Sequence, residues 1–181
     1  MNLRNELPTA ENSSNFNAVA DATTEVGTTL DNLKAAVAGE TGASAKYAAF
    51  AKYAKEKGFD QLARLWEAAS AAEQIHINLE AALVEAEDPD YVRPTAEVPA
   101  PEAIDLNLIA SANGEIYETS DMYPSFIKKA QEEGNAKAVK VFTRAKLAEA
   151  VHAEKYLEAY NNIDAADDDA YYLCPGCGYI H

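Results

Sequence analysis

The chain has 181 residues, of which 48% are apolar; this allows one sizeable hydrophobic core and excludes a wholly disordered protein. Its formal net charge of −15 would repel the phosphates of DNA or RNA, so we expect no nucleic-acid partner. No stretch approaches the roughly 20 apolar residues of a membrane span, and no apolar signal segment follows Met1, so we expect a soluble, cytoplasmic protein without membrane contact.

The first 25 residues are polar and show no regular spacing of apolar side chains. We therefore expect a flexible N-terminal arm over residues 1–25, to which we assign no role. The apolar pattern that begins after it predicts a helical domain over residues 26–162.

Two long helices are predicted at the start of this domain, because apolar side chains recur every three or four positions over about residues 26–57 and 60–87. Asp60 is the predicted N-cap of the second helix. Glu40 lies on the apolar stripe of the first helix, and Glu73 and His76 lie on that of the second. Residues three apart share a face of a helix, so this Glu-x-x-His motif points a carboxylate and an imidazole the same way.

Residues 88–103 hold four of the seven prolines and cannot be helical throughout. A connection this long is unusual between neighbouring antiparallel helices. It is the length expected for a crossover that runs along a helix bundle, as in ferritin-like folds.

The third helix is predicted over about residues 104–133, with Gly134 ending it. Glu115 and Glu118 lie on its apolar stripe, one turn apart. Pro124 interrupts the pattern one turn later, and we expect a kink there.

The fourth helix is predicted over about residues 135–161, and it carries a second Glu-x-x-His motif at Glu149 and His152. The two halves of the chain therefore repeat one pattern: a helix with a glutamate on its apolar stripe is followed by a helix with Glu-x-x-His. The pattern predicts an all-α, antiparallel four-helix bundle of ferritin-like type, with the long crossover between helices two and three.

Six polar side chains would meet where the four helices pack together. Four carboxylates in a dry core repel one another, and each uncompensated charge costs several kcal/mol. Two divalent cations would balance the four charges and leave one histidine for each ion, as in di-iron and di-manganese carboxylate bundles. Hard carboxylates with imidazole favour iron or manganese, whereas zinc takes fewer oxygens. The predicted ligands are Glu40, Glu73, His76, Glu115, Glu149 and His152.

Other polar residues receive weaker assignments. Glu118 is a seventh carboxylate that either reaches the metals or stays on the helix surface. Tyr47 and Tyr123 lie near the metal layer by helical spacing, and either hydrogen-bond to the ligands or a bound peroxide, or simply pack. Five further glutamates are expected to be solvated or paired charges: Glu80, Glu85, Glu87, Glu154 and Glu158.

Together these residues resemble the rubrerythrin family. The matching stretches are Gly39-Glu40-Thr41 with Tyr47, Ala72-Glu73-Gln74-Ile75-His76, Gly114-Glu115-Ile116-Tyr117-Glu118 with Met122-Tyr123-Pro124, and Ala148-Glu149-Ala150-Val151-His152. The resemblance implies a non-haem di-iron peroxidase that reduces hydrogen peroxide to water in oxidative-stress defence. It also implies that all seven residues above, Glu118 included, ligate two iron ions.

The resemblance further implies that Glu118 and His76 exchange at one iron with redox state. It places Tyr47 and Tyr123 at the peroxide site, so that Glu118, Tyr47 and Tyr123 would act in catalysis. Rubrerythrins are commonly dimeric, so we expect a homodimer, with helices that could be exchanged between subunits.

The last segment, residues 163–181, is predicted to be an acidic linker followed by an incomplete rubredoxin-like knuckle. Cys174 and Cys177 form one Cys-x-x-Cys, whereas a rubredoxin centre needs four thiolates around one iron. The sequence is truncated, or another subunit supplies the second pair, or the tail binds no metal; we expect truncation. A completed site would hold one iron or zinc, and otherwise the electrons must come from a separate rubredoxin-like donor.

Peroxide reduction is therefore the predicted function. A ferritin-like ferroxidase or iron-binding protein, and a di-iron oxidase that activates O2, use similar ligands and remain alternatives. Glu118 and the Cys-x-x-Cys favour the peroxidase, because iron storage requires neither.

Overall fold

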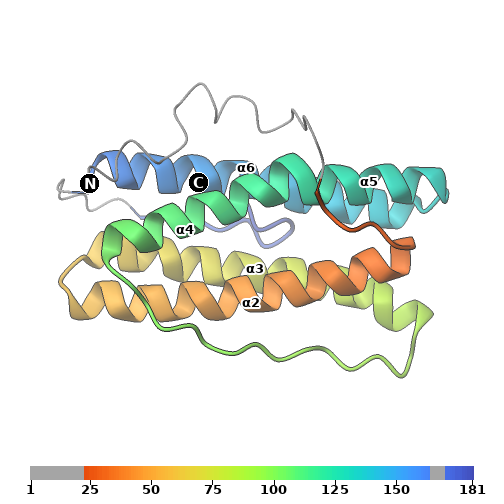
Figure 1. Ribbon diagram of the computed structural model, residues 1–181, viewed down its shortest axis with the longest axis horizontal. Coiled ribbons are helices and arrows are strands. Elements are labelled where there is room, and N and C mark those ends of the chain that lie inside the picture. Colours follow the sequence, from red (N-terminus) through yellow and green to blue (C-terminus); the bar gives the residue numbers. More distant parts are fainter. Residues whose placement is uncertain (1–22, 164–169) are drawn as a thin grey trace.

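Two helical hairpins pack side by side to form the bundle (Figure 1). The structure is a computed structural model that describes residues 23–163 and 170–181. The first hairpin consists of α2 (Thr29–Glu56) and α3 (Asp60–Glu87). In the second, α4 (Ile104–Tyr117), a π-helical turn η2 (Glu118–Met122) and α5 (Tyr123–Glu132) continue one another, and α6 (Ala136–Asn161) runs back beside them.

The predicted ferritin-like four-helix bundle is confirmed, and its predicted helix limits agree with the structure to within a few residues. Residues 88–103 form the crossover, which runs along the length of the bundle in Figure 1. Most of the predicted N-terminal arm, and residues 164–169 of the predicted acidic linker, lie outside the described residues. Within the described ranges, no helix is both long and apolar enough to cross a membrane.

Local sequence signals set where the helices start and stop. Thr28 and Asp31 form a reciprocal capping box at the start of α2, in which each side chain accepts a hydrogen bond from the other's backbone N–H. Gly58 has a positive φ of 82° between α2 and α3, which an L-residue with a side chain rarely adopts. The prediction of Asp60 as an N-cap is wrong: Phe59 occupies that position without a side-chain hydrogen bond, and Asp60 is the first helical residue.

The third helix does not break at Pro124, but its α-helical turns give way to a wider, π-helical turn immediately before the proline. Pro124 has no N–H to give to a carbonyl one turn back, so regular α-helical pairing cannot pass through it. The chain instead forms the π-helical turn η2, and the Tyr123 N–H donates to the carbonyl of Glu118, five residues earlier. This turn begins at Glu118 itself, next to the predicted metal layer.

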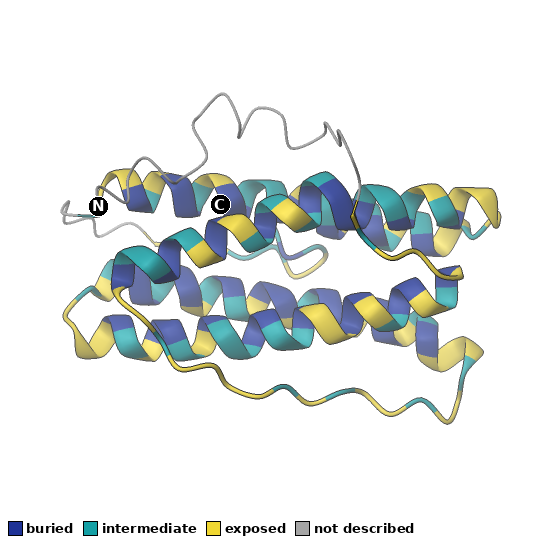
Figure 2. Cartoon of the chain, in the orientation of Figure 1, coloured by how far each residue is buried: buried dark blue, intermediate teal, exposed yellow. Residues whose placement is uncertain are grey.

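The apolar core is divided into two main clusters, and the buried faces of all four helices line it (Figure 2). One cluster surrounds Trp66 and Tyr156, and the other surrounds Phe126 and Phe142. Along α6, for example, Ala145 belongs to the second cluster and Ala153 to the first, with Glu149 between them. The apolar clusters therefore enclose a layer of buried polar side chains at mid-bundle.

Candidate metal centre

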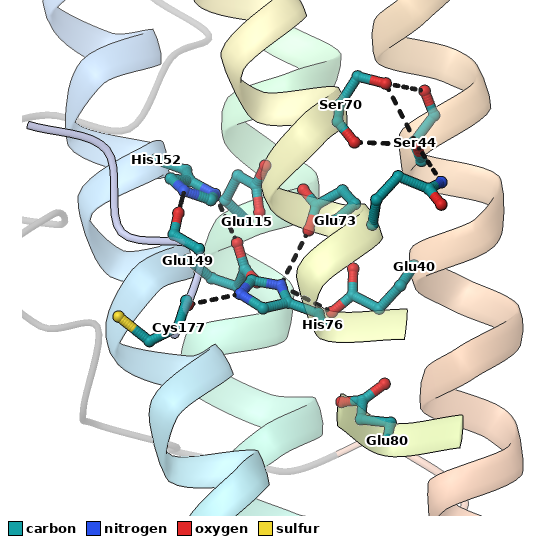
Figure 3. A network of polar contacts seen from close by, with 12 residues as sticks. Glu40, Ser44, Ser70, Glu73, His76, Glu80, Glu115, Glu149, His152 and Cys177 are labelled. Carbon is teal, nitrogen blue, oxygen red and sulfur yellow. Dashed lines mark hydrogen bonds and ion pairs between the residues drawn. The ribbon is translucent and has the colours of Figure 1, made fainter. Parts of the chain in front are cut away.

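Six of the predicted ligands meet in that polar layer, where none is more than 1% exposed (Figure 3). Each comes from the position that its helical stripe predicted: one glutamate from α2, one from α4, and a Glu-x-x-His pair from each of α3 and α6. The six residues are Glu40, Glu73, His76, Glu115, Glu149 and His152.

The six side chains form two overlapping groups, each able to hold one cation. In one group, ligand atoms of Glu40, His76, Glu73 and Glu149 all lie within 4.8 Å of one another. In the other, Glu115 and His152 join the same Glu73 and Glu149 at the same spacing. Each group therefore has its own glutamate and histidine, while two carboxylates are common to both. This carboxylate and histidine cluster fits a di-iron site.

The last segment of the chain orients both imidazoles. Nε2 of His76 lies 2.9 Å from the carbonyl oxygen of Cys177, and Nε2 of His152 lies 2.9 Å from that of Gly178. A carbonyl only accepts, so each Nε2 must be the protonated nitrogen that donates. In the neutral tautomer Nδ1 then carries a lone pair, which both histidines direct into the carboxylate layer.

The contacts inside the layer are close, yet several of its atoms lack hydrogen bonds. His152 Nδ1 lies 2.7 Å from Glu149 Oε2, and His76 Nδ1 lies 2.6 Å from Glu149 Oε1. Nevertheless, His152 Nδ1 and both oxygens of Glu149 have no hydrogen-bond partner within the described ranges, and neither have Glu40 Oε2, Glu73 Oε1 and Glu115 Oε2. Buried polar atoms are rarely left this way. Bound cations would supply the missing partners, because these oxygen and nitrogen atoms face one another with their lone pairs unused.

Electrostatics support the same assignment. Burial, followed by the charge of Glu149, raises the pKa of Glu73 and of Glu115 well above the ordinary value. Burial also disfavours ionised Glu149, but the adjacent His76 and His152 outweigh it and lower the pKa of that carboxyl. Burial alone would lower the pKa of His76, but the Glu149 carboxylate raises it well above its usual range. Raised pKa values favour protonated Glu73 and Glu115 when no cation is bound, which reduces the repulsion within the layer.

Glu118 lies beside the two groups and not within them. It begins the π-helical turn, and its side chain is half-buried. Burial and the charges of Glu40 and Glu115 raise the pKa of Glu118 well above its ordinary value, so its carboxyl group interacts electrostatically with the carboxylates of the layer.

The two predicted tyrosines each donate a hydrogen bond to one carboxylate of the layer. The buried Tyr47 hydroxyl donates to Glu115 Oε1 at 2.6 Å, and the buried Tyr123 hydroxyl donates to Glu40 Oε1. Tyr47 also packs against Tyr156, with ring centroids 5.5 Å apart. Packing and hydrogen bonding were alternatives for these residues; the structure shows both for Tyr47, and Tyr123 likewise packs on Phe142.

The prediction that Glu80 is a solvated or paired surface charge is wrong. Its side chain is 0% exposed, and its Oε1 lies within hydrogen-bond distance of the Tyr123 hydroxyl oxygen, at 2.9 Å. Glu80 lies four residues after His76 on the apolar stripe of α3, so its position already indicated burial. Glu85, by contrast, pairs with Arg93 at 2.7 Å, and the remaining three glutamates of that prediction are exposed.

The two cysteines lie in a small hairpin that packs against the bundle. Their sulfur atoms are 3.2 Å apart, and the hydrogen bond from Cys177 lowers the pKa of the Cys174 thiol. Leu173 pairs with Ile180, which is fully buried among residues of the bundle core. Among residues 23–163 and 170–181, neither thiol joins two further ligands in a metal-binding group.

Comparisons with known proteins are consistent with this geometry. A family model described as rubrerythrin matches residues 31–160. The chain is 67% identical to nigerythrin of Nitratidesulfovibrio vulgaris over 181 residues, which is 100% of this chain and 90% of the relative. It is 34% identical over 160 residues to a rubrerythrin of the same bacterium, covering 84% of this chain and 82% of that relative. A solved structure of nigerythrin in its fully reduced, all-ferrous state matches with a TM-score of 0.90 and 67% identity, over 100% of this chain and 90% of that one.

Removing metal should make the stability of the protein depend on pH. Carboxyl groups whose folded pKa is raised, such as Glu73 and Glu115, stabilise the fold fully below their unfolded value near 4.5, and this stability is lost as pH rises through the folded pKa. Urea unfolding of the metal-free chain should therefore give a free energy that falls as pH rises, by up to about 1.4 kcal/mol per pH unit for each such proton. Two equivalents of Fe(II) under anaerobic conditions should flatten the curve. An identical pH dependence with and without metal would contradict the assignment.

Gly178→Ala should detach the hairpin from the histidines. An added Cβ would lie 2.4 Å from Nε2 of His76, and the φ of 77° at Gly178 adds about 1–2 kcal/mol of backbone strain. Amide hydrogen exchange at Tyr172 and His181, which pair with each other, should accelerate while the helices stay protected. Gly176→Ala is the matched control, since the nearest atom to its Cβ is 3.9 Å away. Equal exchange in the two variants would contradict the close approach.

Proposed function

The chain belongs to the rubrerythrin family, and we propose that it is a non-haem di-iron peroxidase that reduces hydrogen peroxide to water. The observation that carries this proposal is the buried layer of four carboxylates and two imidazoles, whose unpaired atoms face one another in two overlapping groups. When bound there, two ferrous ions would supply the two electrons that the reduction of one peroxide requires.

The proposed iron ligands are the six residues of the layer. Glu73 and Glu149 would serve both ions, Glu40 and His76 one of them, and Glu115 and His152 the other. Carboxylate and imidazole donors suit iron, and the solved structure of nigerythrin described above is of an all-ferrous state. Glu118 is proposed as a seventh ligand that exchanges with His76 at one iron as the charge of the pair changes.

The surrounding residues would keep these groups in place. Tyr47 holds Glu115 and Tyr123 holds Glu40, so each phenol presents a hydroxyl group at the edge of the layer. The backbone carbonyls of Cys177 and Gly178 fix the two imidazoles with Nδ1 turned inward. The apolar clusters on either side exclude water, which strengthens every electrostatic interaction within the site.

The proposal extends to the partners of the reaction. We propose a rubredoxin-like electron donor, a homodimer with helices that could be exchanged, and a cytoplasmic location. Cys174 and Cys177 would bind one iron or zinc only if two further thiolates completed the site.

Oxidation kinetics test the peroxidase proposal directly. The full chain, loaded anaerobically with Fe(II), should be oxidised faster by hydrogen peroxide than by an equal concentration of O2 in a stopped-flow experiment. Faster reaction with O2 would instead favour an oxidase. Assembly into a large shell on size exclusion, rather than a dimer, would favour ferritin-like storage.

Glu118→Ala separates iron binding from turnover. The six residues of the layer remain, so two iron ions should still bind, while peroxide turnover should fall roughly 10–100-fold because the exchanging carboxylate is lost. Glu132→Ala, an exposed residue at the end of α5, is the control and should leave both measurements unchanged. If iron affinity and turnover fell together in Glu118→Ala, the proposed catalytic role of Glu118 would be wrong.

A further inference from the structure

Glu80 is a buried carboxyl group that belongs to neither group of candidate iron ligands. It lies on α3, one turn after His76, and Figure 3 shows it apart from the six clustered side chains. A carboxyl group that is fully buried and belongs to no group of candidate metal ligands needs another reason for its burial.

Its one hydrogen-bond partner within the described ranges is the hydroxyl group of Tyr123. The Tyr123 oxygen lies 2.9 Å from Glu80 Oε1 and also contacts Glu40 Oε1. Glu80 Oε2 has no partner in those ranges. The titratable groups that face Glu80 are Glu40 of α2, His76 of its own helix, Tyr123 of α5 and Glu149 of α6.

Counting hydrogens favours a proton on one of the two carboxyl groups. A phenol has one hydrogen to donate, and an ionised carboxylate has none. The single Tyr123 hydrogen can make a full, two-centre hydrogen bond to only one of two ionised carboxylates. Both contacts are full hydrogen bonds when one carboxyl group is protonated and donates to the phenol oxygen while the phenol donates to the other.

Glu80 is the group that fits the protonated role. Glu40 belongs to a cation-binding group and approaches His76 Nδ1 at 3.5 Å, and metal ligands are deprotonated. An ionised Glu80 would leave a buried charge with a partnerless Oε2, whereas in the neutral acid that atom is an uncharged carbonyl oxygen. Burial, with the charge of Glu40 next to it, raises the pKa of Glu80 well above its ordinary value and is consistent with this choice.

We propose that Glu80 is a protonated positioning residue. It donates its hydrogen to the Tyr123 hydroxyl oxygen and thereby directs the phenol hydrogen to Glu40 and the metal layer. During peroxide reduction it also supplies a proton through Tyr123, and this proton transfer rests on the proposed function. In that reaction hydrogen peroxide accepts two electrons from the iron pair and two protons, its O–O bond breaks, and two water molecules form. Tyr123 gives its hydrogen to a peroxide oxygen and takes the hydrogen of Glu80, and solvent supplies the second proton and later reprotonates Glu80.

Infrared difference spectroscopy tests the protonation state without using activity. The metal-free and the Fe(II)-loaded full chain should both show the C=O stretch of a protonated carboxyl group, shifted in D2O, that disappears in Glu80→Gln. Tyr123→Phe provides a second variant, which leaves Glu80 in place but should shift its C=O band by removing the hydrogen-bond acceptor. Glu87→Gln, an exposed residue at the end of the same helix, should leave the spectrum unchanged. A spectrum that Glu80→Gln leaves unchanged overturns the proposal.

Peroxide turnover tests the proton transfer. The amide of Glu80→Gln can still donate a hydrogen bond to Tyr123, but it has no acidic proton to transfer. Turnover should fall roughly a hundredfold, the usual scale for a general acid, and should decrease further as pH rises, because solvent must then supply the proton. Wild type and Glu87→Gln should be less sensitive to pH. Wild-type rates and a wild-type pH profile in Glu80→Gln overturn the proton transfer.

The two experiments separate this proposal from the proposed function. If the wild-type chain fails to reduce peroxide, the peroxidase assignment and the proton transfer both fail, and the infrared result still decides whether Glu80 is a neutral acid bound to Tyr123. If the wild type reduces peroxide but Glu80→Gln keeps the same spectrum, the function stands and the role of Glu80 is wrong.

Discussion

The mutual repulsion of four carboxylates in a water-free layer is the constraint on which the rest of this structure depends. Each buried charge that lacks compensation costs several kcal/mol, and stability has to come from elsewhere. The two apolar clusters lie on either side of the layer and supply that stability, while the helices carry the carboxylates between them. The unpaired atoms of Glu40, Glu73, Glu115 and Glu149 show that residues 23–163 and 170–181 do not by themselves satisfy the layer.

The residues around the layer restrict how its members can move. Tyr47 and Tyr123 each donate to one carboxylate of the layer, and two backbone carbonyls of the terminal hairpin bind the outer nitrogens of the imidazoles. Glu118 has a different environment, at the start of a π-helical turn and outside both ligand groups. The layer thus combines fixed members with one carboxylate whose backbone is irregular, which supports the proposal that Glu118 is the ligand that exchanges.

Much of this arrangement could be predicted from the sequence because helical spacing determines which residues share a face. The positions of Glu40, Glu73 and Glu149 followed from stripes repeating every three or four residues, and proline content located the crossover. The burial of Glu80 was missed, although its stripe position indicated it, because most glutamates on helices are solvated.

Other features depend on contacts between distant parts of the chain. The carbonyls of Cys177 and Gly178 reach the histidines from 101 and 26 residues away, and no local pattern encodes such a contact. A kink was predicted at Pro124, and the structure has a π-helical turn at Glu118–Met122, just before the proline.

Metal content measured together with metal position tests the central claim most directly. The full chain would be loaded with Fe(II) without oxygen, its iron counted by elemental analysis, and the ions located by anomalous diffraction at the iron edge. Two ions per chain, one near Glu40 and His76 and the other near Glu115 and His152, are predicted. Fewer than two ions per chain, or ions bound only outside the carboxylate layer, would contradict the account.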